Sequence, residues 1–573
     1  MFRPALTLLA LLALAACNFT PTQAPLPPSV IPATLAPTDT EAAVQTASAQ
    51  VEATLARLTP PERVGQMFMV GFTAGDTDPA ALVEQTHTGG VVLFEQNVGT
   101  PQETAALVNR LQAAALETTG VPLLVATDQE GGVVAQLRRG FTYWPNAMAV
   151  AATGNLDMAE RVGAGIAEEL RAVGINMNLA PVVDVLDNPA NTVIGVRSFG
   201  SNPDAVAAFG RATRRGFYSM GVIATARHFP GHGSVAQDSR TTLPIDARSR
   251  AEIDAMLAPF AALIADGVDA VLLAHVVYPA LSDDGLPAAF SPTIATDLLR
   301  GQLGFQGVIV SDAPSMDAVL EQYSVEEAAQ RAILAGADVL ILSPNIPAAQ
   351  QAAAVQHVVT LVEAGEISPA RIDASARRIL DLKERYGLLA WEPIDPQGIA
   401  FHLSAHQTLS YEAVAYAVTL LRDQGGLLPL DPNRAVTVIY PLDFFGVPDI
   451  FRVYDPDVRA IGVTYAVSPA ERSQALAAAE EGEQIVMLTL DVSRFPGQGE
   501  LVRALPAGQT VVAAIRSPFD VLAFPSVNTY LLTYSGNDYA LDALARVLYG
   551  RLGAQGRLPV EISGAGTTPP DWG

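Results

Sequence analysis

The chain has 573 residues, half of them hydrophobic, and a formal net charge of −25 from 34 basic and 59 acidic side chains. This length predicts two or more domains with sizeable cores, because single hydrophobic cores rarely grow so large. The excess of acidic side chains argues against nucleic acid and anionic lipid surfaces as partners, since both would be repelled.

The first residues carry the pattern of an exported protein. Arg3 precedes an apolar run that ends at Ala16 and is too short for a good transmembrane helix. Cys17 follows small residues and resembles the lipidated cysteine of bacterial lipoproteins. We therefore expect residues 1–17 to be a lipoprotein signal peptide, and the mature protein to be anchored by its lipid on the extracytoplasmic face of the membrane. An ordinary secretory signal is the alternative.

Two further features of this end of the chain concern its structure. Cys17 is the only cysteine, which excludes an intramolecular disulfide. Residues 18–45 are rich in proline and threonine and have few large apolar side chains. They cannot build a core, so we expect an extended tether between the lipid and the folded domains.

Residues 46–392 alternate short apolar runs with longer amphipathic ones. Eight apolar runs predict buried strands: Gln66–Val70, Gly90–Phe94, Val121–Ala126, Asn176–Ala180, Gly221–Ala226, Asp269–Ala274, Gly307–Ser311 and Asp338–Leu342. Segments between them, such as 104–117 and 157–173, have apolar residues at helical spacing. Buried strands alternating with helices predict a parallel sheet covered on both faces, and eight such units suit a (β/α)8 barrel of the TIM type. A doubly wound open sheet is the alternative.

A break rich in proline at 391–398 separates this region from a second domain, residues 401–565. Its segment Ala413–Leu421 has a helical pattern. Four apolar runs predict buried strands: Ala435–Tyr440, Gln484–Leu490, Thr510–Ile515 and Thr529–Tyr534. Helical stretches lie between them, so the sequence predicts an αβα sandwich.

Polar side chains stand at or just after the ends of four predicted barrel strands. These residues are Asp128, His228, His275 and Asp312. The carboxyl ends of barrel strands converge on one face, where active sites of such barrels are built. The sequence therefore predicts a site that combines these side chains.

Two of these strand ends carry a motif. Residues 227–240 begin with Arg-His-Phe-Pro-Gly-His-Gly and end with Asp-Ser-Arg, and Val310-Ser311-Asp312 follows downstream. Together they resemble the signature of glycoside hydrolase family 3, and within it the bacterial β-N-acetylhexosaminidases. The resemblance extends over residues 58–562 and implies a retaining hydrolase in which Asp312 is the nucleophile.

The resemblance also implies the residues that hold the sugar. Asp128 opens an Asp-Gln-Glu-Gly-Gly segment, and Arg197 lies in Ile-Gly-Val-Arg-Ser-Phe-Gly. Both segments match the family's substrate-binding motifs. Arg227 and His228 stand where the family's Lys-His pair contacts sugar hydroxyls. We expect these four side chains to bind substrate, His232 to hold the loop and His275 to form a pocket wall.

The chain departs from the family at the proton donor. The resemblance implies an Asp-His pair on this loop, but the chain has Asp238 and Arg240. Arginine stays protonated in proteins and cannot act as an acid and a base in turn. Asp238 is itself a candidate acid if burial raises its pKa, although Arg240 would lower it. A carboxylate of the second domain, such as Asp491 or Glu500, is the other candidate.

The resemblance implies a retaining glycosidase that acts on β-N-acetylglucosaminides, such as fragments of peptidoglycan or chitin. The sequence has no metal-ligand spacing, phosphate loop or dinucleotide motif, so no cofactor is implied. Two alternatives stay open. One is a sugar-binding lipoprotein that has lost catalysis, and the other is a β-glucosidase or β-xylosidase of the same family.

Overall fold

The computed structural model describes residues 40–73, 75, 78–311, 319, 321–481 and 483–562. The chain divides into residues 1–46 and residues 47–573, and the two domains lie in the second unit. The predicted lipidated residue Cys17 and the predicted nucleophile Asp312 lie outside the described residues. Within the described ranges, no helix is both long enough and apolar enough to cross a membrane.

A closed barrel of eight strands forms the first domain, with the neighbour order β1-β10-β9-β8-β7-β6-β3-β2. The strands, all parallel to their neighbours, are β1 (Phe68–Val70), β2 (Gly90–Leu93), β3 (Leu124–Thr127), β6 (Met177–Asn178), β7 (Ile223–Phe229), β8 (Ala270–Leu273), β9 (Val308–Ser311) and β10 (Val339–Leu342). All their residues are buried. The sequence prediction of a TIM-type barrel is confirmed, and the open sheet is excluded.

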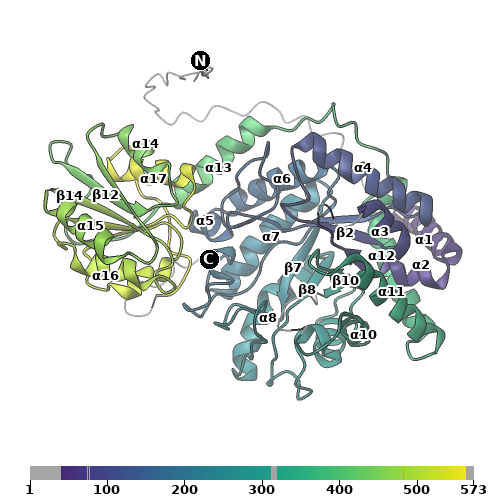
Figure 1. Cartoon of the computed structure of the whole chain (residues 1–573). Helices are drawn as coiled ribbons and strands as arrows, with labels where there is room; N and C mark the ends of the chain where they lie inside the picture. Colours follow the sequence, from purple (N-terminus) through teal and green to yellow (C-terminus); the bar gives the residue numbers. More distant parts are fainter. Residues whose placement is uncertain are drawn as a thin grey trace. The chain divides into compact units, whose positions relative to one another are not determined.

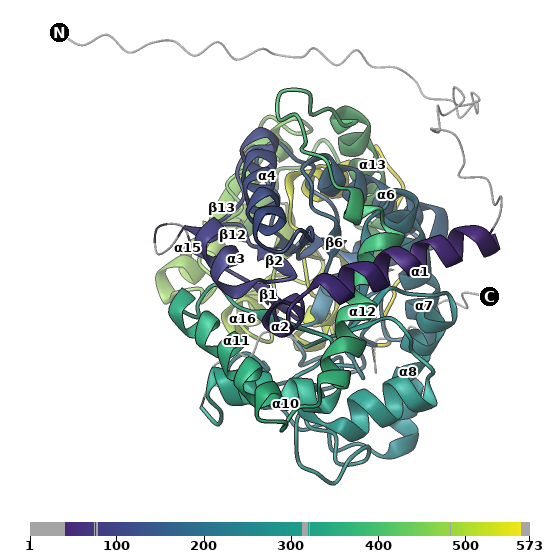
Figure 2. The ribbon, with the colours of Figure 1, turned by 90° about the vertical axis from the view of Figure 1, so that its right-hand side faces the viewer.

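Helices cover the outside of the barrel, and Figure 2 shows them around β1, β2 and β6. Those that precede or follow barrel strands are α1 (Thr40–Arg57), α2 (Pro60–Gln66), α3 (Pro79–Thr86), α4 (Pro101–Thr118), α5 (Ala147–Ala152), α6 (Leu156–Ala172), α7 (Pro203–Ser219), α8 (Arg250–Ala265), the π-type η3 (Thr293–Gln302), α10 (Val325–Ala335), α11 (Ala348–Glu363) and α12 (Pro369–Arg385). Short 3-10 turns are η1 (Gly195–Arg197), η2 (Ala288–Phe290) and η4 (Leu388–Ala390). The strands and the buried faces of most of these helices share one hydrophobic core, whereas α1 packs in a separate cluster with α12.

Local capping decides where several of these helices begin. The Thr100 hydroxyl at the start of α4 accepts a hydrogen bond from the Glu103 N–H at 3.3 Å, and the Glu103 carboxylate accepts one from the Thr100 N–H at 2.8 Å. The same reciprocal pair opens α8 and α10. These reciprocal hydrogen bonds satisfy N–H groups that have no partner within the helix. They therefore fix the residue at which the helix begins and the preceding loop ends.

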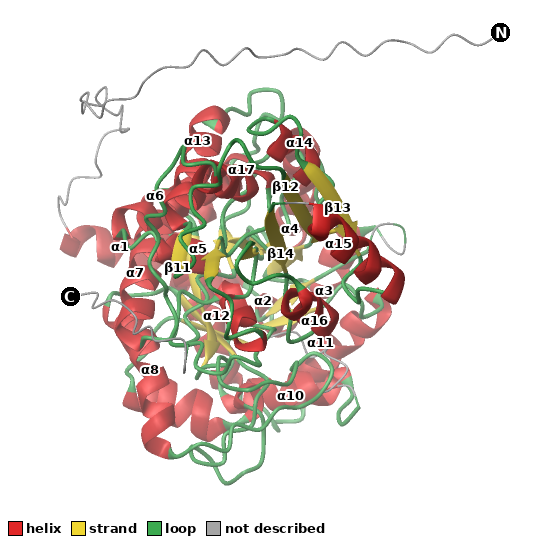
Figure 3. Cartoon of the chain, turned by 90° about the vertical axis from the view of Figure 1, so that its left-hand side faces the viewer, coloured by secondary structure: helices red, strands yellow, loops and turns green. Residues whose placement is uncertain are grey.

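The second domain is built on a six-stranded sheet with the order β11-β16-β15-β14-β12-β13, shown in yellow in Figure 3. Its strands are β11 (Thr419–Asp423), β12 (Val436–Pro441), β13 (Arg459–Val463), β14 (Gln484–Thr489), β15 (Thr510–Ala514) and β16 (Thr529–Leu532). Its helices are α13 (Leu403–Ala417), α14 (Val447–Arg452), α15 (Pro469–Glu481), α16 (Pro496–Ala504), η5 (Pro518–Ala523) and α17 (Asp538–Leu548). Figure 1 colours this domain green to yellow.

Helices pack on both faces of this sheet, as the predicted αβα sandwich requires. Side chains of α14 and α17 form one core with the sheet, and side chains of α15 and α16 form another. The prediction of a helix over Ala413–Leu421 is wrong at its end. The helix stops at Ala417, and Thr419 begins β11, which pairs antiparallel with β16 at the edge of the sheet.

The core on the α15 and α16 face continues into the barrel domain. It unites Met148 of α5 and Val182 after β6 with Ile485 of β14 and Leu501 of α16. Hydrogen bonds also cross here, such as the one that the Arg557 N–H donates to the Ala152 carbonyl at 2.8 Å. The two domains therefore share buried surface as well as a linker.

The last described residues form a brace on a barrel loop. The Ser201 N–H donates to the Pro559 carbonyl at 3.1 Å, and the Glu561 N–H donates to the Ser201 hydroxyl at 2.8 Å. Gly200 lies so close that a Cβ atom there would stand 2.2 Å from the Pro559 oxygen. A glycine is therefore required at this contact, three residues after Arg197.

Candidate active site

Three described strands deliver polar side chains to the carboxyl end of the barrel. Asp128 directly follows β3, Arg227 and His228 lie within the last three residues of β7, and His275 follows β8. This is the face on which barrels of this type build their active sites. Asp312 is the residue directly after β9, and the structure describes nothing beyond Ser311 there.

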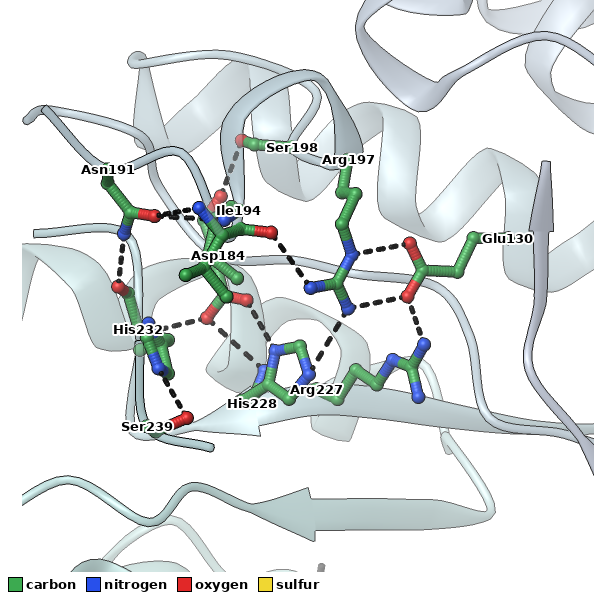
Figure 4. A network of polar contacts seen from close by, with 12 residues as sticks. Glu130, Asp184, Asn191, Ile194, Arg197, Ser198, Arg227, His228, His232 and Ser239 are labelled. Carbon is green, nitrogen blue, oxygen red and sulfur yellow. Dashed lines mark hydrogen bonds and ion pairs between the residues drawn. The ribbon is translucent and has the colours of Figure 1, made fainter. Parts of the chain in front are cut away.

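A buried ion-pair network joins the ends of β3 and β7, and Figure 4 shows part of it. The Arg227 guanidinium donates to the carboxylates of both Asp128 and Glu130. Arg197 donates to the two oxygens of Glu130 at 2.8 and 2.7 Å, a bidentate pair. The Glu130 side chain is only 4% exposed, so this carboxylate balances two guanidinium charges away from water.

The charges of the network fix its protonation states. Burial alone would raise the pKa of Glu130, but the guanidinium groups of Arg197 and Arg227 lower it to about 2. Burial alone would lower the pKa of Arg227, but Asp128 and Glu130 raise it above its usual value. Glu130 is therefore an acceptor for these arginines near neutral pH and cannot donate a proton there.

Asp184 orients the two histidines of the loop after β7. It is fully buried, and its carboxylate accepts hydrogen bonds from the backbone N–H groups of His228 at 3.2 Å and His232 at 2.7 Å. The Nδ1 atom of His228 lies 2.7 Å from the other carboxylate oxygen. Burial would raise the pKa of Asp184, but these partners hold it below its usual value, so the group is ionised.

An ionised Asp184 determines the tautomer of His228. A carboxylate only accepts, so Nδ1 must carry the hydrogen that faces Asp184. Nε2 of the same ring lies 3.4 Å from the Arg197 guanidinium, which only donates. The other ring nitrogen, Nε2, therefore lies on the side of Arg197 and the cavity.

The rest of the loop carries the departure from the family motif. The Nε2 atom of His232 lies 3.0 Å from the Ser239 hydroxyl, and burial lowers the pKa of His232 to about 4. His232 thus holds the loop as a neutral ring, as predicted. Arg240 donates hydrogen bonds from Nε and Nη2 to the two carboxylate oxygens of Asp238, at 2.9 and 2.7 Å. These hydrogen bonds lower the pKa of Asp238.

A cavity of about 560 Å³ opens over the network. Its lining includes Asp128, Arg197, Arg227, His228, His232, Ser239 and Arg240. The volume suits a small ligand such as a sugar, and the charged groups converge on it from several strands. All four residues predicted to bind substrate are thus brought to one cavity.

Two predicted positions do not join this cavity. His275 is buried and its ring packs edge-on against Phe290 at 5.4 Å between centroids, and the ring is not among the described residues that line the cavity. The ring contacts Phe290 of η2, and the role of His275 as a pocket wall stays a prediction. Asp238 likewise does not line the cavity, although its neighbours Ser239 and Arg240 do.

The second-domain carboxylates named as candidate acids lie elsewhere. Asp491 lines a separate narrow crevice between the domains, where it lies 3.3 Å from Arg516. Glu500 pairs with Arg472 at 3.5 Å, and both side chains are largely exposed. Neither lines the 560 Å³ cavity.

Sequence reasoning missed three residues that the structure places at the site. Glu130 belongs to the same Asp-Gln-Glu-Gly-Gly motif as Asp128, and Asp184 lies in the loop after β6. Glu95 lies two residues after β2 and lines the cavity. All three share the signal of an acidic side chain shortly after a barrel strand, which could have found them.

A hairpin positions Asp128 and Glu130 against the second domain. It consists of β4 (Gln129–Gly131) and β5 (Val134–Ala135). Gly132 at its turn has φ +59°, and a Cβ atom there would meet the Asn146 side chain at 1.9 Å. Asn146 accepts a hydrogen bond from Val133 N–H at 2.9 Å and donates one to the Tyr534 carbonyl at 2.8 Å.

Comparison with known proteins covers both domains. The family model of the glycosyl hydrolase family 3 N terminal domain matches residues 59–382. The beta-N-acetylglucosaminidase/beta-glucosidase of Cellulomonas fimi is 30% identical over 552 residues, which cover 90% of this chain and 95% of that protein. Beta-hexosaminidase A of Pseudoalteromonas piscicida is 30% identical over 602 residues, which cover 90% of this chain and 99% of that protein.

A solved structure agrees with these sequence matches. It is a glycoside hydrolase family 3 beta-N-acetylglucosaminidase from Paenibacillus sp. str. FPU-7. It superposes with a TM-score of 0.83 at 37% sequence identity and covers 88% of this chain and 99% of that one. Both the barrel and the second domain are therefore shared with this relative.

Proposed function

We propose, from the premise that this chain belongs to glycosyl hydrolase family 3, that it hydrolyses β-linked N-acetylglucosaminides with retention of configuration. One observation carries the proposal. The acceptor Asp128 and the donors Arg197 and Arg227 converge on one cavity at the barrel mouth. The names of the Cellulomonas and Pseudoalteromonas relatives support the N-acetylglucosaminide as substrate. Peptidoglycan and chitin fragments contain this sugar in β-linkage.

The network binds the sugar through its spare hydrogen-bonding groups. Asp128 is engaged by Arg227 and still has lone pairs for sugar hydroxyls. The His228 ring presents Nε2 to the cavity, and the guanidinium groups offer further N–H donors. Because these groups are already held by Glu130 and Asp184, the site is ordered before the sugar arrives.

The covalent step belongs to Asp312 in this proposal. Its carboxylate attacks the anomeric carbon, the glycosidic C–O bond breaks, and a glycosyl ester forms that water then hydrolyses. The departing oxygen takes up a proton. Asp238 is the sequence's candidate donor, but its pair with Arg240 favours the carboxylate form.

The test is turnover of an aryl β-N-acetylglucosaminide by the chain without residues 1–45, beside an Asp312→Asn variant. We expect turnover by the unaltered site and a loss of about three orders of magnitude or more in the variant, because the nucleophile is removed. An aryl β-glucoside belongs in the same assay, since the Cellulomonas relative is named for both activities. No turnover of either substrate by the folded protein would favour a sugar-binding protein instead.

We propose also that the protein is exported and anchored by a lipid on Cys17. The support is the short apolar run after Arg3 and the small residues that precede this cysteine. In cells supplied with labelled palmitate, the full chain should incorporate label and sediment with membranes. A Cys17→Ser variant should do neither. Secretion of the full chain without incorporation of labelled palmitate would mean that the first residues are an ordinary signal peptide.

A further inference from the structure

A second cavity opens beside the sugar cavity, at the carboxyl ends of β1 and β10. Its volume is about 410 Å³. Residues 71–73, which directly follow β1, form one side, and residues 344–349, which follow β10 and begin α11, form the other. Leu82 of α3 and Gln351 of α11 complete the described lining. The proposed function has not yet given this second cavity an occupant.

Hydrogen bonds hold the two sides of the second cavity together. The Gly71 N–H donates to the Leu342 carbonyl at 2.8 Å, and a Cβ atom at Gly71 would stand 2.7 Å from the Pro344 nitrogen. The Gln351 amide donates from Nε2 to the carbonyls of Gly71 and Ile346, both at 2.8 Å. The Gln351 side chain therefore ties one side to the other, and the barrel itself gives the second cavity its shape.

The lining combines apolar surface with an unpaired acceptor. Its apolar side chains include Phe72, Pro344, Ile346 and Pro347. Gln351 is only 1% exposed, and its Nε2 already serves two carbonyls. Its Oε1 has no hydrogen-bond partner among the described residues. A buried acceptor without a partner is costly, and an N–H or O–H group of a ligand would supply one.

Asn345 joins the second cavity to the sugar cavity, because it lines both. Its backbone N–H donates to the hydroxyl of Ser343, which lines the sugar cavity, at 3.2 Å. On the β2 side, the Asn97 amide donates to the Phe72 carbonyl at 2.7 Å and accepts from the Phe94 N–H at 2.9 Å. Phe94 also lines the sugar cavity. A ligand that fills the sugar cavity can therefore continue past Asn345 into the second cavity.

A pyranose ring suits this mixture of surfaces. The C–H groups of a β-linked pyranose form apolar faces, which pack on rings such as those of Phe72 and the two prolines. The hydroxyl and acetamido groups of an amino sugar lie at the edge of its ring, where the Asn345 amide and Gln351 Oε1 offer hydrogen-bonding partners. An apolar lining with a few placed polar groups is typical of small-molecule sites.

We propose that the second cavity binds the neighbouring ring of a β-linked N-acetylhexosamine oligomer whose first ring fills the sugar cavity. The inference rests on the proposed function and deepens it, since it makes an oligosaccharide the preferred ligand. Asn345 stands at the junction of the two rings. The residues of the second cavity determine specificity in this proposal and take no part in bond breaking.

The experiment measures the binding of one-ring and two-ring ligands to the purified full chain by titration calorimetry. Both ligands carry sulfur in place of the glycosidic oxygen, which resists hydrolysis. They are methyl β-thio-N-acetylglucosaminide and the methyl glycoside of S-linked chitobiose. We expect the two-ring ligand to bind about tenfold or more tightly than the one-ring ligand, because its second ring buries apolar surface and adds hydrogen bonds.

Filling the second cavity should remove this preference. Ala349 is an exposed residue of the lining, so Ala349→Trp places a ring in the cavity without changing the core. The affinity for the two-ring ligand should fall about tenfold or more, and that for the one-ring ligand should stay within about twofold. The matched control is Ala364→Trp, at the exposed end of the same helix, which should leave both affinities unchanged.

A smaller change tests the junction. In Asn345→Ala the side-chain amide is lost, while the backbone bond to Ser343 is kept. The two-ring ligand should bind about three- to tenfold more weakly than to the unaltered protein, as expected for the loss of one hydrogen bond.

A third ligand distinguishes the sources of the glycan. It is the S-linked disaccharide whose second ring is N-acetylmuramic acid, which carries a lactyl carboxylate. A preference over the one-ring ligand for chitobiose alone would indicate chitin fragments, and a preference that includes the muramyl disaccharide would indicate peptidoglycan. Either preference supports the role of the second cavity if Ala349→Trp removes it.

Several results would overturn that role while leaving the proposed function intact. They are equal affinities of the unaltered protein for one-ring and two-ring ligands, a preference that survives Ala349→Trp, and an equal loss for both ligands in that variant. A phenyl β-thioglycoside that binds as tightly as the two-ring ligands would assign the cavity to apolar groups instead. Failure of the folded protein to bind any of these ligands would overturn the proposed function, and this inference with it.

Discussion

Glu130 is the residue on which both guanidinium groups of the sugar site converge. No single stretch of sequence indicates this, because Arg197 and Arg227 lie 67 and 97 residues away. The motif around Asp128 predicted a substrate contact, whereas the structure gives Glu130 the task of holding the arginines. The four residues that the resemblance singled out, Asp128, Arg197, Arg227 and His228, line one cavity, but the resemblance could not reveal how they are held together.

Replacing Glu130 by Gln should reduce stability in a pH-dependent way. The folded-state pKa of about 2 lies below the ordinary value of 4.5, so Glu130 contributes stability above pH 4.5 that is lost as pH falls toward 2. The difference corresponds to roughly 3 kcal/mol. Urea unfolding should show Glu130→Gln to be less stable than the wild type at pH 7, and the gap should narrow between pH 4.5 and 2.

The exposed Glu366, which follows α11, supplies the control for charge removal, and Glu366→Gln should match the wild type across this range. A Glu130→Gln gap that stays constant from pH 7 to pH 2 would mean that lost packing, not the ion pairs, causes the destabilisation. The KM for the aryl glycoside should rise in Glu130→Gln, because the arginines lose the partner that orients them.

At the scale of elements, α13 is held to barrel helix α6 by two histidines and two glutamates. The buried His406 of α13 lies 2.9 Å from a Glu169 oxygen through Nδ1 and 3.1 Å from a Glu168 oxygen through Nε2. His402, just before the helix, lies 2.7 Å from Glu168. Burial alone would lower the pKa of His406, but the two carboxylates raise it.

A raised histidine pKa predicts that this contact weakens in alkali. The contribution to stability is fully present below pH 6.5, the unfolded value, and is lost as pH rises through the higher folded pKa. Hydrogen exchange corrected for intrinsic rates should show α13 less protected at pH 9 than at pH 6. His406→Gln should remove this difference.

The matched control for that measurement is His357 on α11, whose Nε2 lies 3.3 Å from Gln330 and which forms no ion pair with a carboxylate of the described residues. His357→Gln should keep the pH dependence of α13. Equally low protection of α13 at pH 6 and pH 9 in His406→Gln would fit the ion-pair model. Protection of α13 in His406→Gln that still falls between pH 6 and pH 9, as in the wild type, would contradict it.

The elements that the sequence predicted and those that it missed differ in burial. All eight barrel strands were predicted, because each is buried on both faces and reads as a continuous apolar run. The strands of the second sheet that were missed are β11 and β13, which form its two edges, and the short hairpin strands β4 and β5 were missed as well. Edge strands are only partly buried, and the charged Arg422 and Asp423 in β11 interrupt the apolar run that would have indicated a strand. The helical spacing of the apolar residues in α13 was therefore read on into the first residues of β11.

At the scale of the whole molecule, the shared core predicts that both domains unfold together. Buried side chains of α5 and the loop after β6 belong to the same cluster as those of β14 and α16. Separating the domains would expose this cluster to water, which disfavours a half-folded state. Scanning calorimetry of the chain without residues 1–45 should show one transition whose calorimetric and van't Hoff enthalpies agree.

Two resolved transitions would contradict this coupling and would mean that the shared cluster contributes little. A second test is the variant Leu501→Ala, which removes a buried side chain of the second domain from this cluster. It should lower the single transition temperature by a few degrees, because a truncated core leucine costs about 2–5 kcal/mol.

The brace formed by the last described residues also sets an order of events during synthesis. Ser201 receives its bond from Glu561, which is made 360 residues later. At about 5–20 residues per second, this interval lasts roughly 20 to 70 s on the ribosome. The contact between the loop after η1 and residues 559–561 therefore forms only once residue 561 has been made, after all eight barrel strands have been synthesised.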